Sequence, residues 1–244
     1  MSDSNKLLKD AILSYNRKNF DEAKILFLEV IDKDPTNPEA NYYLGLMFTK
    51  DNNDKRAVLH LKNVVDLGTN FLFTTQCRMI LGYIYYKNQD YERAEYEFKV
   101  VLDSKLNLVQ VNSALAAIYH QMNDKKKAVE FAEKAHEIDQ FNLNAKNTYA
   151  FLLSDYDIDA IKSLEMMREV VRVKPNNPAY LDSLGWAYYK KGDVKASLAS
   201  LKKALEINKN YQDSIEHYDI VTGKKSFYGD KNWLDRFSLQ YHFV

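Results

Sequence analysis

The chain has 244 residues with 34 basic and 34 acidic side chains, so its formal net charge is zero. Binding to nucleic acid depends on clustered Lys and Arg, and the even balance therefore argues against a nucleic-acid partner. One cysteine excludes an internal disulfide framework and a Cys-based zinc site, and a content of 28% charged and 46% hydrophobic residues is typical of a helix-rich soluble protein.

The sequence shows no membrane-spanning or export segment. No apolar run approaches the about 18 residues that cross a bilayer. The first ten residues, MSDSNKLLKD, lack the apolar core of a signal peptide. We therefore expect a cytoplasmic protein, or a periplasmic or membrane-peripheral one if an export signal has been removed.

An internal repeat begins near the N-terminus and continues for most of the chain. Small residues recur in FDEAKILF, DKRAVLHL, YERAEYEF and KKKAVEFA, at Ala23, Ala57, Ala94 and Ala128. A second series, which precedes most of these, runs through Ala11, Gly45, Gly82, Ala116, Ala150 and Gly185. Each repeat holds two stretches with apolar residues at helical spacing, which predict helix pairs starting near residues 4, 38, 75, 109, 143 and 178.

Three repeats depart from the common pattern. The second ends in VDLGTNFLF instead of Asp-Pro, which adds three residues before the third. In the fifth, the small position of the second helix falls on Ser163 or Ala160, and in the sixth it falls on Ser197. We expect the array to continue through these sites, with a bend where the pattern changes.

The segments LGLMF (44–48), LGYIY (81–85), LAAIY (115–119) and LGWAY (184–188) resemble the tetratricopeptide repeat family, and bacterial members in particular. The resemblance implies an all-α fold, a right-handed superhelical solenoid of about six helix pairs with a C-terminal capping segment. On this basis residues 1–210 form the repeat array, and residues 211–244 form a capping helix and an aromatic-rich tail.

The C-terminal segment leaves two interpretations open. Residues 212–221 begin a seventh first helix, with Tyr218 at the Leu position and Asp219 at the Gly position of the repeat. The tail beyond them is rich in rings, and it either caps the last repeat or forms a partner-binding arm. The cap is the interpretation that we prefer; in an arm, the alternation of Leu239, Tyr241 and Phe243 would let the segment add to a sheet as a strand.

Catalytic and cofactor signatures are missing from the sequence. The five histidines form no HExxH motif, no glycine-rich phosphate loop is present, and Cys77 has no evident base beside it. We therefore predict a chain that is not an enzyme and that binds no metal or cofactor.

The resemblance implies a concave groove lined by the first helix of each repeat. It assigns to this groove Tyr42, Leu46, Met79, Tyr83, Tyr86, His120, Asn147, Phe151, Asp182, Trp186, Tyr189 and Lys190. Leu8 and Ile12 stand where a carboxylate clamp would need Lys and Asn, which argues against a receptor for C-terminal tails.

An aromatic and amide-rich groove favours a protein or peptide partner. We expect a non-catalytic interaction scaffold, an assembly or adaptor factor of envelope or motility machinery, that enters a larger complex. The alternative is a regulatory subunit or sensor whose groove binds a small ligand.

Overall fold

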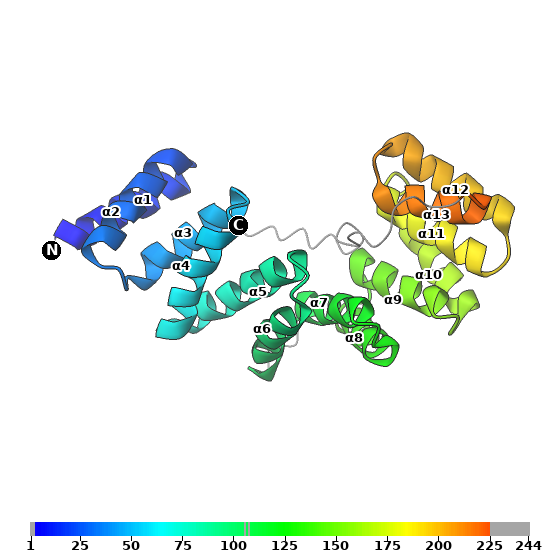
Figure 1. Ribbon diagram of the computed structural model, residues 1–244, viewed down its shortest axis with the longest axis horizontal. Coiled ribbons are helices and arrows are strands. Elements are labelled where there is room, and N and C mark those ends of the chain that lie inside the picture. Colours follow the sequence, from blue (N-terminus) through cyan, green and yellow to red (C-terminus); the bar gives the residue numbers. More distant parts are fainter. Residues whose placement is uncertain (1–2, 105, 107, 225–244) are drawn as a thin grey trace. The chain divides into compact units, whose positions relative to one another are not determined.

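The computed structural model describes residues 3–104, 106 and 108–224, and within them it contains thirteen α-helices and no strand (Figure 1). The first helices of the six pairs are α1 (Asp3–Asn16), α3 (Pro38–Lys50), α5 (Phe71–Lys87), α7 (Val109–Gln121), α9 (Leu143–Asp155) and α11 (Pro178–Lys190). The second helices are α2 (Phe20–Lys33), α4 (Asp54–Leu67), α6 (Tyr91–Asp103), α8 (Lys125–Ile138), α10 (Ala160–Val173) and α12 (Val194–Ile207). The fold is the predicted all-α array of helix pairs.

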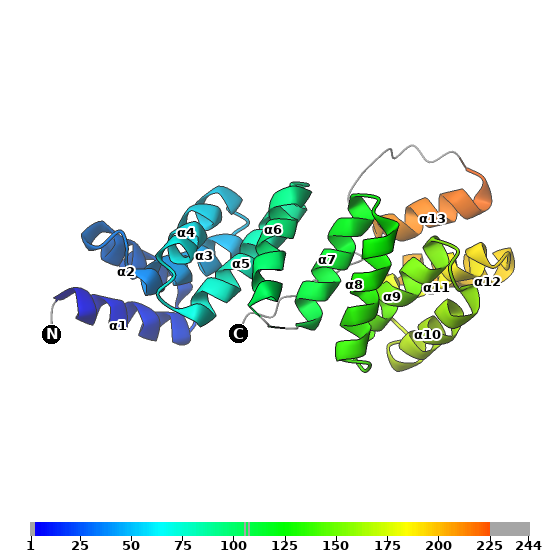
Figure 2. The same ribbon diagram turned by 90° about the horizontal axis from the view of Figure 1, so that it is seen from below.

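The chain divides into two compact units, an N-terminal unit of Met1–Leu106 and a C-terminal unit of Asn107–Val244. The last described helix, α13 (Gln212–Thr222), packs against α11 and α12 of the C-terminal unit (Figure 1 and Figure 2). The sequence placed a boundary at 210/211, and that division stays a prediction. The aromatic tail, which was predicted to be either a cap or a partner-binding arm, lies outside the described residues.

Capping residues and tight turns set the helix boundaries. The Asn37 side chain accepts a hydrogen bond from the Ala40 N–H at 3.0 Å, directly before Pro38 in the first turn of α3. Within each pair, one residue of the turn between the helices has a positive φ: Lys18, Asn52, Gln89, Asn123, Asp157 and Gly192. The same left-handed turn therefore reverses the chain in all six pairs.

The small positions let the two helices of a pair approach closely. A Cβ atom built on Gly82 would lie 2.7 Å from the Phe98 ring, and one on Gly45 would lie 2.5 Å from Leu61. Real Cβ atoms do not approach so closely, so an alanine at either glycine would require the facing side chain to shift. In the fifth repeat the Ser163 Oγ is buried and donates to the Ala150 carbonyl at 2.7 Å, which identifies Ser163, not Ala160, as the small residue.

The three added residues between repeats two and three lengthen a helix. Helix α4 ends at Leu67, followed by Gly68 with φ of 59°, and the Asn70 side chain accepts from the Phe73 N–H at 3.1 Å. Helix α5 therefore begins at Phe71, four residues before the predicted start at 75, and has an extra turn. None of the described helices combines the length and apolar character needed to cross a bilayer.

Candidate partner-binding surface

The twelve predicted groove residues fall into two groups by exposure. Buried are Tyr42, Met79, Tyr86, Asn147, Phe151 and Asp182. Half-buried are Leu46, Tyr83, His120, Trp186, Tyr189 and Lys190. Only the half-buried side chains present surface to a partner without a change in the packing between repeats.

In the N-terminal unit, Tyr42 joins two successive first helices. Its hydroxyl donates to the Gln76 amide oxygen at 2.5 Å, and its ring stacks on Phe73 with centroids 4.2 Å apart. Phe73 belongs to the extra turn of α5, so the lengthened helix is what covers this tyrosine. Burial raises the pKa of the Tyr42 hydroxyl, which stays neutral and acts as a donor.

In the C-terminal unit, His120 begins a row of contacts between neighbouring first helices. Its Nδ1 is hydrogen-bonded to the Tyr156 hydroxyl at 2.6 Å, and its ring meets buried Phe151 edge-on at 6.1 Å. Burial raises the pKa of Tyr156 to about 12, with Asp155 and Asp124 adding to the effect. Tyr156 and Phe151 therefore hold the half-buried His120 imidazole in place, with one edge of the ring at the surface.

Trp186 lies at the centre of a ring cluster in the C-terminal unit. Its Nε1 donates to Asp155 Oδ1 at 2.9 Å, and its indole stacks on His217 of α13 at 4.1 Å with the planes 12° apart. Tyr189 lies beside it, with centroids 5.3 Å apart, and Lys190 donates to Asp157 at 2.8 Å. These four contacts fix three half-buried side chains of α11.

Two predicted groove residues face other helices of the protein. The Asp182 carboxylate is fully buried, and its Oδ1 accepts from Ser214 Oγ at 3.0 Å and contacts His217 Nδ1 at 3.0 Å. Asn147 is 5% exposed, and its amide nitrogen donates to the Ser183 hydroxyl at 3.2 Å. A partner could reach Asp182 only after α13 had moved.

Comparison with protein families decides what these repeats are. The tetratricopeptide repeat family matches residues 109–142 and 178–211, the fourth and sixth helix pairs. The chain contains tetratricopeptide repeats. This confirms the family resemblance and the all-α helical repeat fold predicted from the sequence.

Relatives of this tetratricopeptide repeat protein include lipopolysaccharide assembly protein B of Haemophilus influenzae, which is 24% identical over 268 residues. The alignment covers 97% of this chain and 62% of the relative, so the chain spans about three fifths of that protein's length. The relative is bacterial, which fits the expected bacterial origin.

Two solved structures share the fold. YrrB, described as a TPR protein with an unusual peptide-binding site, is 16% identical with a TM-score of 0.59, over 78% of this chain and 96% of its own. The pilF protein of Pseudomonas aeruginosa is 15% identical with a TM-score of 0.69, over 91% and 97%. At these identities the likeness shows the fold alone.

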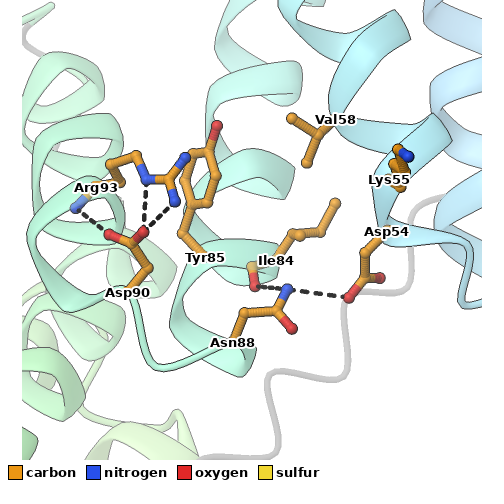
Figure 3. Close-up of a pocket in the computed structure, with 8 residues that line it drawn as sticks. All are labelled: Asp54, Lys55, Val58, Ile84, Tyr85, Asn88, Asp90 and Arg93. Carbon is orange, nitrogen blue, oxygen red and sulfur yellow. Dashed lines mark hydrogen bonds and ion pairs between the residues drawn. The ribbon is translucent and has the colours of Figure 1, made fainter.

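A pocket of about 370 Å³ in the N-terminal unit of the repeat protein was not predicted (Figure 3). Its lining residues are Asp54, Lys55, Val58, Ile84, Tyr85, Asn88, Asp90 and Arg93. The Arg93 Nε donates to Asp90 at 2.6 Å, and its guanidinium lies 4.6 Å from the Tyr85 ring centroid. The hydrogen bond from Arg93 lowers the pKa of the Asp90 carboxyl.

Cys77 has a structural role in the repeat protein. Its side chain is fully buried, and burial raises the pKa of the thiol to about 12. The thiolate is the reactive form of cysteine, and at neutral pH it is not populated here. This environment is that of a packing residue.

The repeat pattern did not predict three residues that shape the surface. Phe73 precedes the predicted start of its repeat, Tyr156 follows the last residue of α9, and His217 belongs to the seventh first helix. Each lies outside the repeat positions that define the groove. A signal for Phe73 was the Asn70 capping residue, which moves the start of α5 toward the N-terminus.

Proposed function

We propose that this tetratricopeptide repeat protein is a non-catalytic scaffold that binds a segment of a partner protein in the groove lined by its first helices. The observation that carries the proposal is the cluster of Trp186, Tyr189 and Lys190 on α11. All three side chains are half-buried, and all three are held by neighbours within the C-terminal unit.

Fixed aromatic side chains are well suited to binding. Trp186 is held on one side by Asp155 and on the other by His217, so little side-chain entropy is lost when a partner covers it. Rings of this kind dominate many interfaces, where truncation to alanine costs about 2 kcal/mol or more. The partner that fits is a peptide segment with an apolar side chain for the rings and a polar group for Lys190.

The pathway belongs to the proposal as well. A relative over almost the whole chain is named for lipopolysaccharide assembly, and we propose that this protein serves an assembly complex of the bacterial envelope. In that role it acts as an adaptor, which joins other proteins without catalysing a reaction. In that role the protein is located with the envelope complex that it serves.

Site-specific photo-crosslinking tests the groove. A photoreactive phenylalanine analogue replaces Tyr189 in one variant and Tyr188 in another, and the products are identified by mass spectrometry from bacterial cells. Tyr188 is the matched control, because it is a half-buried neighbour on the same helix that contacts Arg168 of α10 instead. We expect defined protein adducts from position 189, absent from position 188 and weakened by Lys190→Ala.

The same experiment can contradict the proposal. Equal adducts from both positions would show that α11 meets proteins at random. If position 189 yields no adduct, thermal shift with a panel of metabolites decides whether a small ligand occupies this surface. If one compound raises the melting temperature of the wild type but not that of Tyr189→Ala, the protein is a sensor that binds a small ligand and not a scaffold.

A further inference from the structure

The second helices of the N-terminal unit carry an outward-facing apolar row. Ile25, Leu59 and Tyr96 are each the sixth residue of their helices, α2, α4 and α6. Their side chains are 60%, 58% and 60% exposed. At 100° per residue the sixth position lies about half a turn from the buried fourth, eighth and eleventh positions, which on α2 are Ala23, Phe27 and Val30.

The repeat fold does not require large apolar residues here. The sixth residues of α8, α10 and α12, in the C-terminal unit, are Glu130, Glu165 and Ala199. The position therefore accepts charged and small side chains in helices of the same fold. Three large apolar residues in succession at such a position mark a surface for interaction.

A row of carboxylates runs beside the apolar row. The thirteenth residues of α2, α4 and α6 are Asp32, Asp66 and Asp103, and all three are exposed. Seven residues of α-helix separate the two rows, a rise of about 10 Å, which is about the diameter of a helix with its side chains. Two lysines also lie on this face at the ninth position, Lys62 and Lys99, and Lys99 is paired with Glu95.

The pocket of Figure 3 opens between the same helices. Lys55 and Val58 of α4 line one side, Arg93 of α6 and Tyr85 of α5 line the other, and Ile84 of α5 lies between them. Val58 precedes Leu59 of the apolar row, and Arg93 is one turn before Tyr96. A hollow of about 370 Å³ therefore lies near the row, between α4 and α6, and it is large enough for a side chain of a bound partner.

From these features we propose that the outer face of α2, α4 and α6 is a second docking surface, whose partner is an amphipathic helix with an apolar stripe flanked by Lys or Arg. The stripe covers Ile25, Leu59 and Tyr96, and the basic flank lies over the aspartates. An anionic membrane surface is disfavoured, because the three carboxylates would face its headgroups. This surface is separate from the groove proposed above, and either can fail without the other.

Binding of a synthetic peptide to the full chain tests the surface. The probe is a labelled helical peptide of Leu on one face and Lys on the flank, followed by fluorescence anisotropy, and a second peptide has Glu in place of Lys. The triple variant Ile25→Ala, Leu59→Ala, Tyr96→Ala takes the residue that α12 carries at this position, and alanine also favours the helix. We expect it to bind the Leu–Lys peptide about tenfold more weakly or worse.

The charge row has its own variant. Asp32→Asn, Asp66→Asn, Asp103→Asn keeps the shapes and removes three charges, and we expect an affinity loss of about threefold to tenfold with a shallower salt dependence. The matched control, Ile138→Ala, Val173→Ala, Ile207→Ala, truncates three exposed apolar residues at the last positions of α8, α10 and α12. It should bind the peptide as the wild type does, and circular dichroism should show all variants folded.

Several outcomes would overturn the proposal. The Leu–Glu peptide binding as tightly as the Leu–Lys peptide would remove the role of the aspartates, and an equal loss in the control variant would show non-specific adsorption. Sedimentation equilibrium that finds a dimer broken by the first triple Ala variant would make a second copy the occupant. If the wild type binds vesicles of phosphatidylglycerol and phosphatidylethanolamine and the triple Ala variant does not, the occupant of this surface is a lipid membrane.

Discussion

The two units each bury a histidine, but at different interfaces. In the N-terminal unit His60 of α4 is 8% exposed, and its Nδ1 contacts the Asn41 amide oxygen of α3 at 2.9 Å, within one helix pair. In the C-terminal unit His217 of α13 is 1% exposed and reaches Asp182 of α11, between successive first helices. One contact holds a pair together, and the other holds the last helix on the array.

The largest effect should follow from breaking the second contact. His217→Ala removes a hydrogen-bonding partner of buried Asp182 and the ring under Trp186, and we expect a loss of about 3 kcal/mol in the stability of α13 packing. Hydrogen exchange measured by mass spectrometry should show faster exchange in α13 and the facing part of α11. The helices of the N-terminal unit should keep their protection.

A histidine with poorer contacts provides the control for this prediction. His136 of α8 is half-buried, and its Nδ1 is buried without a hydrogen-bond partner. Because His136→Gln removes no such bond, it should change exchange in α13 little. If both variants release α13 equally, the Asp182 contact is not what holds it.

Spacing and residue size predicted most of the fold, because the contacts inside a helix pair are local. The spacing within a single repeat is enough to place Gly82 of α5 opposite α6, where Phe98 lies. It also places Ala116 at the same position on α7. The start of α5 was wrong by four residues, since a single capping residue, Asn70, outweighed the repeat spacing. The choice between Ser163 and Ala160 needed the structure, because both residues are small.

The second prediction compares equivalent positions in the two units. In the N-terminal unit Gly82 faces Phe98, whereas Ala116 in the C-terminal unit occupies the same repeat position. Gly82→Ala should cost about 1–3 kcal/mol, since a Cβ 2.7 Å from the ring forces the pair apart. Ala116→Gly forces nothing apart and should cost only about 0.5–1 kcal/mol through backbone entropy.

Urea unfolding followed by circular dichroism measures both variants. Because repeat arrays can unfold in steps, hydrogen exchange should place the first loss in α5 and α6, and the second in α7 and α8. A neutral Gly82→Ala would mean that the Phe98 ring can rotate away. The close approach would then not set the geometry of that pair.

The site was predicted less completely than the fold. The repeat spacing places Asp182, Trp186 and Tyr189 on one helix, but it does not say which of them another helix covers. In α13 the Leu and Gly positions, Tyr218 and Asp219, are half-buried, and His217 is the buried residue instead. No described second helix packs on α13, so Tyr218 and Asp219 lack the neighbour that covers the Leu and Gly positions in the complete pairs, and α13 is buried through α11 and α12 alone.

The smallest effect concerns the other histidine and depends on pH. Burial, with a contribution from Arg56, lowers the pKa of His60 below its ordinary value of about 6.5. As the pH falls through about 6.5, the unfolded chain takes up a proton at His60 that the native state excludes. The contribution of neutral His60 to stability is therefore complete above this pH and is lost progressively below it. Hydrogen exchange in α3 and α4 at about pH 7.5 and about pH 5.5 should therefore show a larger loss of protection on acidification in the wild type than in His60→Gln. The same loss in both proteins would mean that His60 titrates alike in the native and unfolded states, and the contrast between the two buried histidines would then be one of position alone.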